Sequence, residues 1–119
     1  MKRKMLKFDP ELSAHLEEKI RAYGYDAAKK KMFGHVVYFI NGYIFTGANE
    51  QGIFVHLGAA ARDRALKEEK GTVPFEPIEG TIMREYPLLK KQVHTDSRKL
   101  KKWLDRASRY LDSLPPKKK

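Results

Sequence analysis

The sequence predicts a single α+β domain with a mainly antiparallel sheet, in the order helix, three-stranded meander, helix, extended pair, helix. Apolar residues recur at helical spacing near both ends of the chain, and an Asn-Gly pair separates two β-rich runs. The 119 residues are enough to bury one core. We therefore expect a domain over residues 9–114, flanked by basic tails at 1–8 and 115–119.

The first helix is expected to begin at Asp9-Pro10, because Asp is a favoured N-cap and Pro is preorganised for the first helical position. Gly24 is expected to end it. Between them one apolar stripe recurs at helical spacing, formed by Leu12, Leu16, Ile20 and Tyr23.

Residues 32–47, MFGHVVYFINGYIFTG, predict a hairpin that turns at Asn41-Gly42, since a type I′ turn needs positive φ at both central residues. A basic connector, residues 29–31, precedes it, and GIFVHL adds a third strand. The turn sets Phe39 opposite Ile44 and Tyr38 opposite Phe45. One face then carries Val36, Tyr38, Ile40, Tyr43 and Phe45, and the other carries His35, Val37, Phe39, Ile44 and Thr46.

Both faces of this hairpin are mostly apolar, so a helix on one face leaves the other in need of cover. We expect a protein interface there, with another protein or a second copy of this chain as partner. Its candidate residues are Val37, Phe39, Ile44 and Thr46. The alternative is that the first and last helices shield both faces within one monomer.

The second half of the chain predicts two more helices around an extended pair. Residues 59–70 are rich in Ala, Glu and Lys and stop at Gly71. Residues 72–80 are too rich in proline for a central strand and are expected to form a connector or an edge, and residues 82–93 form an extended segment broken at Pro87. The last helix, capped by Thr95 or Asp96, has one apolar stripe of Leu100, Trp103, Leu104, Ala107, Leu111 and Leu114.

Positive charge is concentrated at the two ends of the chain. The net charge is +10, and residues 8–83 hold nine bases against eleven acids. Such an excess attracts nucleic acid by counterion release, so a nucleic-acid accessory protein is the alternative function class. Its candidate contacts on the last helix are Arg98, Lys102, Arg106 and Arg109. Solubility and surface pairing explain the same charges without any ligand.

The sequence carries no recognisable catalytic or metal-binding pattern. It has no cysteine, and its four histidines are scattered without ligand spacing, with His35 and His56 on neighbouring strands as the pair to check first. The serines lie on predicted helices or caps without a nucleophile elbow. We therefore expect no enzymatic activity, no metal and no cofactor. The residues Met32 and Phe33 are expected to lie in the core or at a sheet edge.

The basic N-terminus is not followed by an apolar signal core, which argues against a secretory signal. There is no run of about 18 apolar residues that could span a bilayer. We expect a cytoplasmic protein with no membrane partner.

A set of motif residues spread along the chain, taken together, resembles the TfoX/Sxy N-terminal domain family. The residues that carry the resemblance are Met32, Phe33, Gly34, Tyr38, Gly42, Phe45 and Trp103, with PFEPIEG, MREY and SLPPK in the same order. The resemblance implies an αβββαββα fold like that of secretion chaperones. It also implies a non-enzymatic bacterial module, since the family is named for a regulator of competence for DNA uptake. Regulators of that kind carry a second, C-terminal domain, and only PPKKK follows Leu114 here.

Overall fold

The computed structural model describes residues 4–117 as one α+β domain. Its elements are α1 (Pro10–Tyr23), β1 (Ala28–Met32), β2 (His35–Ile40), β3 (Tyr43–Asn49), β4 (Gly52–Val55), α2 (Ala59–Glu68), β5 (Thr72–Ile78), β6 (Thr81–Leu89), α3 (Lys91–His94) and α4 (Ser97–Asp112). The strands form one antiparallel sheet in the order β1-β2-β3-β4-β6-β5. The predicted class and sheet type are confirmed, and the predicted order lacked β1 and the short α3.

The two long helices begin and end where local sequence rules place them. Asp9 caps α1 by accepting a hydrogen bond of 3.0 Å from the Leu12 amide, and Gly24 ends the helix at a φ of 77°. Asp96 caps α4 through the amides of Arg98 and Lys99. Within residues 4–117, no helix is long and apolar enough to cross a membrane.

The connector predicted at residues 29–31 is instead part of β1, an edge strand paired with β2. Three consecutive lysines have low strand propensity, so no sequence pattern indicated a strand. Exposed lysines do suit an edge strand, because they discourage unwanted pairing of its free side. The hairpin between β1 and β2 turns at Phe33-Gly34, with φ angles of 51° and 80°.

The hairpin between β2 and β3 turns at Asn41-Gly42 as predicted, with φ angles of 57° and 85°. The pairing of Phe39 with Ile44 is also confirmed. Beyond it the register shifts, and Tyr38 lies opposite Thr46 rather than Phe45. The extra residue is a β-bulge, which moves Thr46 onto the face of Tyr38. The prediction that Thr46 belongs to the second face was therefore wrong.

The proline-rich segment forms β5 at the other edge of the sheet, as expected for an edge. Pro87, by contrast, does not break β6, which is continuous through Leu89. Pro87 lies opposite Pro74, next to a register shift, and pairing of β6 with β4 begins only at Leu88. The missing amide of Pro87 therefore removes no bond from the central ladder.

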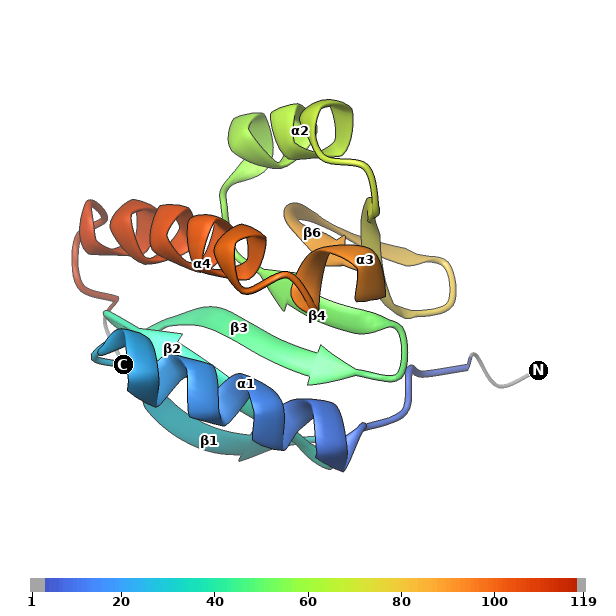
Figure 1. Ribbon diagram of the computed structural model, residues 1–119, viewed down its shortest axis with the longest axis horizontal. Helices are drawn as coiled ribbons and strands as arrows, with labels where there is room; N and C mark the ends of the chain where they lie inside the picture. The colour runs from blue at the N-terminus through green and yellow to red at the C-terminus, as the bar shows by residue number, and fades with distance from the viewer. Residues whose placement is uncertain (1–3, 118–119) are drawn as a thin grey trace.

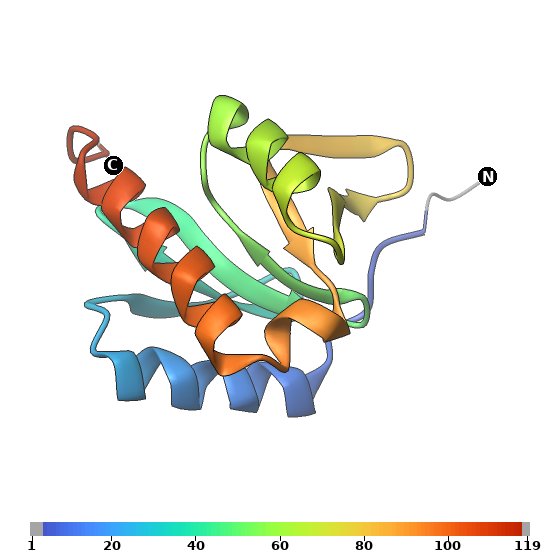
Figure 2. The same ribbon diagram turned by 45° about the horizontal axis from the view of Figure 1, so that its top comes forward.

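The helices lie on one side of the twisted sheet (Figures 1 and 2). Leu16 of α1, Ala65 of α2, Val93 of α3 and Trp103 of α4 all enter one buried core cluster with the sheet. No helical residue within 4–117 enters the cluster on the opposite face. The alternative in which the first and last helices shield both faces was therefore wrong.

Candidate functional site

The face opposite the helices is lined by what we call the second-face cluster. Its buried members are Val37, Phe54, Phe75, Tyr86 and Leu88, and its partly buried members are Leu6, Met32, Phe39, Ile44, Val73 and Met83. The rings of Phe54 and Phe75 stack with centroids 4.4 Å apart, and Tyr86 meets both edge-on. The β4–β6 half of this face is thus closed by its own aromatic packing.

The described part of the predicted N-terminal tail also covers this face. The Leu6 amide donates 2.9 Å to the carbonyl of Pro77, and the Glu79 amide donates 2.8 Å to that of Lys4. Met5 forms a β-bridge with Ile78. Residues 4–6 therefore extend the edge at β5, while residues 1–3 of the predicted tail lie outside the described residues.

The predicted C-terminal tail is likewise held against the fold over its described part. The Tyr43 hydroxyl donates 2.8 Å to the carbonyl of Pro115, and the Lys117 amide donates 3.2 Å to that of Asn41. Residues 118–119 lie outside the described residues. The described N-terminal segment thus lies along the β5 edge, and the described C-terminal segment lies at the β2–β3 turn.

The predicted interface residues are only partly brought together. Val37 is buried inside the second-face cluster and Thr46 is buried on the helix side, where its hydroxyl donates 2.6 Å to the carbonyl of Phe54. Phe39 and Ile44 stay half-buried on the second face. The ammonium of Lys30 lies 4.9 Å from the centre of the Phe39 ring. The accessible part of the predicted interface is therefore Phe39 and Ile44, beside β1.

Among the family-motif residues, the larger buried ones have clear structural roles. Phe45 and Trp103 lie in the core under the helices. Tyr38 is buried beside them, and its hydroxyl donates 3.1 Å to Glu17 of α1. Burial, followed by the hydrogen bond to Glu17, raises the pKa of Tyr38 to about 12. These three positions are explained by packing of the sheet against α1 and α4.

The motif residues in turns are explained by backbone conformation or by packing, with one exception. Gly34 and Gly42 take positive φ, which glycine adopts without strain, and Met32 packs against the second-face cluster. Phe33 does neither, since its side chain is 83% exposed and its φ is 51°. The expectation of a core or edge role holds for Met32 and was wrong for Phe33. The sequence singled out Phe33 as a motif residue but gave no sign that its side chain is exposed.

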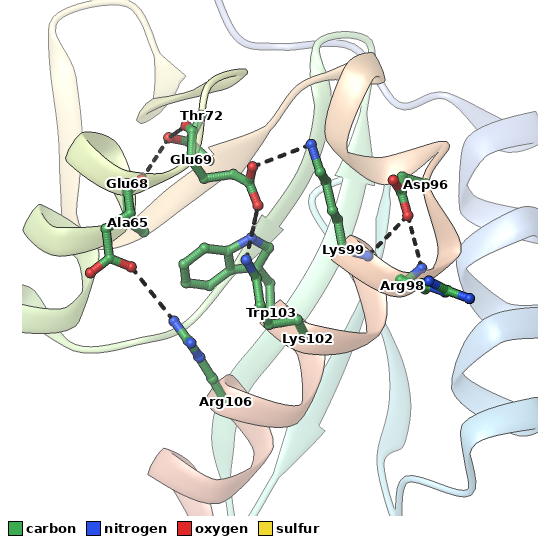
Figure 3. Close-up of polar contacts among 10 residues, drawn as sticks. All are labelled: Ala65, Glu68, Glu69, Thr72, Asp96, Arg98, Lys99, Lys102, Trp103 and Arg106. Atoms are coloured by element: carbon green, nitrogen blue, oxygen red, sulfur yellow. Dashed lines mark hydrogen bonds and ion pairs between the residues drawn. The ribbon is translucent and has the colours of Figure 1, made fainter.

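Two of the four predicted nucleic-acid contacts, Lys102 and Arg106, lie on the flank of α4 that faces α2 (Figure 3). Lys102 reaches Glu69 at 3.2 Å, and Arg106 lies 3.9 Å from Glu68. The Nε of Arg109 donates 3.4 Å to the carbonyl of Asp105. Arg98 is exposed at the start of the helix, with its side chain directed away from α2 in Figure 3. Acidic residues of α2 and its C-cap thus partly neutralise this flank.

Glu69 is a buried carboxylate that sequence reasoning missed. It is 8% exposed, follows the last turn of α2, and accepts a 3.0 Å hydrogen bond from the Trp103 indole (Figure 3). Lys99 and Lys102 complete its shell at 3.5 and 3.2 Å. Burial raises the pKa of Glu69, but the hydrogen bonds from Trp103 and Lys102 and the lysine charges outweigh it and hold the pKa below its usual value. Trp103, Lys99 and Lys102 all belong to α4, so the contacts of Glu69 serve to hold α2 against α4.

The two histidines to be checked as a pair have separate surroundings. The ring of His35 meets Phe8 edge-on at 5.8 Å. The buried ring of His56 stacks on Tyr86 at 4.2 Å and contacts the Ile44 carbonyl at 2.7 Å and Glu85 at 2.8 Å. In the described part of the chain, no three His, Asp or Glu side chains are grouped to hold a metal ion.

Comparison with known families bears on nearly the whole fold. A family model described as the TfoX N-terminal domain matches residues 22–110, from the end of α1 into the last turns of α4. No curated protein and no solved structure matches the chain, so the likeness to secretion chaperones stays a prediction. Because the match covers most of the chain and includes the hairpin motif, the chain belongs to the TfoX N-terminal domain family.

Proposed function

We propose that this domain is a non-enzymatic protein-interaction module whose partner docks at the tip of the β1–β2 hairpin. The observation that carries the proposal is Phe33, an aromatic side chain that is 83% exposed at a φ of 51°. Asn or Gly fits a positive φ better, and the fold gains no packing from the ring. Strain and exposure of this kind point to function rather than to stability.

The surroundings of Phe33 support a contact surface larger than one ring. Met32, Phe39 and Ile44 are partly buried members of the second-face cluster on the adjoining strands. Burying one phenylalanine in a partner contributes about 2 kcal/mol, and aromatic anchors are typical of binding hot spots. The half-buried side chains beside it would then form the rest of the apolar contact.

Positive charge beside the hairpin tip favours an acidic partner. Lys29 is paired with Glu17 at 2.6 Å, whereas Lys31 is exposed next to the turn. Lys30 covers one face of the Phe39 ring. We propose a protein partner with an apolar pocket and an acidic rim, either another protein or a second copy of this chain, in a cytoplasmic assembly linked to transcription or competence.

The test compares two exposed apolar residues on different hairpins. Phe33→Asn removes the proposed anchor, and Ile82→Asn removes a side chain that is 51% exposed at the start of β6. Tagged wild-type protein and each variant are used to recover partners from the native organism, and their self-association is measured by light scattering. We expect Phe33→Asn alone to lose the partner or the dimer. Equal losses in both variants, or none in either, would refute the proposal.

The competing proposal is that the basic residues of α4 bind nucleic acid. It is less well supported than the hairpin interface, because Lys102 and Arg106 already contact the carboxylates of Glu69 and Glu68. Phosphate-dominated binding weakens with salt, with a log-log slope of about 0.9 per contacted phosphate on duplex DNA. Fluorescence anisotropy with duplex and single-stranded oligonucleotides at roughly 50 mM salt separates the two accounts. Tight, salt-sensitive binding that is lost in Arg98→Gln would favour the competing account.

A further inference from the structure

A groove separates α2 from α4 on the helix side of the sheet, away from the proposed hairpin anchor. Its volume is about 580 Å³, within the range of small-molecule sites. The two helices are joined across it by polar contacts at one end, where Glu69 meets Trp103 and Lys102. At the other end, Tyr110 closes against Gly58, where an added Cβ would come within 2.8 Å of the tyrosine ring.

The floor of the groove is apolar and is left open by small residues. Ala61 and Ala65 are the α2 residues that line the floor, with Leu57 just before the helix. On the α4 side the lining includes Trp103 and the half-buried Tyr110. Leucine at the alanine positions would fill the space, so the composition of α2 keeps the groove empty of its own side chains.

The rim of the groove carries three guanidinium groups against one carboxylate. Arg64, Arg106 and Arg109 line it together with Glu68. Arg106 lies 4.8 Å above the Trp103 ring and 3.9 Å from Glu68, too far for a tight pair. Arg109 is exposed and uses its Nε on the backbone carbonyl of Asp105, so its two terminal nitrogens can turn to a ligand, although the Asp105 carboxylate attracts the same guanidinium. Planar guanidinium groups match the oxygens of carboxylate and phosphate.

We propose that the α2–α4 groove binds a small organic anion with an apolar body. Its carboxylate or phosphate is held by Arg106 and Arg109, and its apolar part lies on Ala61, Ala65 and Leu57. An apolar floor gives no advantage to a bare polyanion, so a nucleic acid fits this groove less well than an amphiphilic acid does. The site does not depend on the proposed hairpin interface, because no residue is shared between them.

The probes are laurate and dodecyl phosphate, with acetate and inorganic phosphate as headgroups without the apolar body. Isothermal titration calorimetry below the critical micelle concentration gives affinities, and amide shifts in a ¹⁵N-labelled protein locate the site. We expect both long-chain probes to bind at least tenfold tighter than their bare headgroups. We also expect the shifts to centre on α2 and the last turns of α4.

Three variants make the test decisive. The double variant Arg106→Gln/Arg109→Gln is expected to weaken laurate binding at least tenfold, and Ala61→Leu is expected to weaken it by filling the floor. Arg98→Gln, on the same helix but outside the groove, is the control for net charge and is expected to change affinity less than twofold. Circular dichroism checks folding, and the arginine variants decide the matter if Ala61→Leu is unfolded.

Four results would overturn the proposal. Equal affinity for dodecyl phosphate and inorganic phosphate would show charge attraction alone. Equal weakening by Arg98→Gln would show the same. Shifts centred on Phe33, or binding of an oligonucleotide with none of laurate, would move the ligand to another surface or another class. These outcomes do not affect the hairpin proposal, because that proposal is tested by whether Phe33→Asn loses the protein partner or the dimer.

Discussion

The indole nitrogen of Trp103 donates a 3.0 Å hydrogen bond to Glu69, which joins the middle of α4 to the end of α2. The contact spans 34 residues of sequence and lies at one end of the α2–α4 groove. Lys99 and Lys102 neutralise the same carboxylate. The hydrogen bond between Trp103 and Glu69 therefore helps to set the distance between α2 and α4.

Removing this carboxylate should destabilise the domain. Glu69→Ala leaves the Trp103 indole without its partner and is expected to cost about 2 kcal/mol in the free energy of unfolding. Urea unfolding followed by fluorescence of Trp103, the one tryptophan, measures it. Glu68→Ala is the matched control, because that exposed carboxylate lies 3.9 Å from its cation and is expected to contribute within about 0.5 kcal/mol. Equal effects in the two variants would contradict a specific role for Glu69.

The same carboxylate should make part of the stability pH-dependent. Its pKa is held below the usual value, so its stabilising charge is fully present above the pKa of the unfolded chain and is lost as pH falls through the folded value. We expect the difference in unfolding free energy between wild type and Glu69→Gln to be constant near neutral pH and to shrink in acid. If the difference in unfolding free energy stays constant down to strongly acidic pH, the charge of Glu69 does not contribute to stability.

Asn41 should stabilise more than its own turn. Its side-chain amide donates 3.1 Å to the carbonyl of Leu111 and 2.8 Å to that of Leu114, at the end of α4. Asn41→Ala loses both bonds and places alanine at positive φ, so we expect a cost of about 2 kcal/mol. Asn41→Gly tolerates the φ and is expected to cost about 1 kcal/mol. Thermal or urea unfolding of both variants separates the two contributions, and equal costs would rule out the conformational part.

His94 should make the fold sensitive to mild acid. Nδ1 of this buried ring has no hydrogen-bond partner within residues 4–117. Burial, with the nearby His15 and Lys91, lowers the pKa of His94 below 6.5, and Asp9 only partly opposes this. The unfolded chain then binds the proton more readily, so stability is full above about pH 6.5 and falls as pH drops toward the folded pKa.

The variant His94→Gln tests this directly. Its unfolding free energy should fall less than that of wild type between neutral pH and mildly acidic pH, because the group that must stay neutral is gone. His35→Gln is the control, since His35 is only partly buried on β2, and it should retain the wild-type pH dependence. If the unfolding free energy of His94→Gln falls with pH as steeply as that of wild type, another group causes the acid sensitivity.

Features that depend on a few adjacent residues could be predicted from the sequence. The caps at Asp9 and Asp96 and the turn at Asn41-Gly42 follow local rules of hydrogen bonding and φ preference. The apolar stripe of α4 likewise identified a face that packs into the core. For this reason the class, the starts of the two long helices and the family were accessible without the structure.

Features that depend on distant partners could not be predicted. The bulge at Phe45 depends on how β3 pairs with β2, which no local pattern signals, and it moved Thr46 to the other face. Glu69 finds Trp103 across the fold, and no spacing in the sequence signals it. The exposure of Phe33 was hidden because an aromatic residue is usually buried. The proposed surface is therefore centred on the β1–β2 turn rather than on the predicted β2–β3 hairpin, and it shares only Phe39 and Ile44 with the residues predicted from the sequence.

Phe33 is expected to lower, and not to raise, the stability of the isolated domain. Phe33→Asn places a residue that tolerates positive φ at the hairpin tip, so we expect the free energy of unfolding to stay equal or rise by up to about 1 kcal/mol. Urea unfolding of wild type and variant measures this. A clear loss of stability would mean that the ring packs in the free protein, contrary to its 83% exposure.

Site-specific photocrosslinking in cells tests the proposed interface most directly. A benzophenone amino acid replaces Phe33 in one protein and Ile82 in another, since both positions are exposed on hairpins of the same sheet. The account predicts a discrete crosslinked species, either a second copy or one other protein, from position 33 and none from position 82. No adduct at position 33, or the same adducts at both positions, would contradict it.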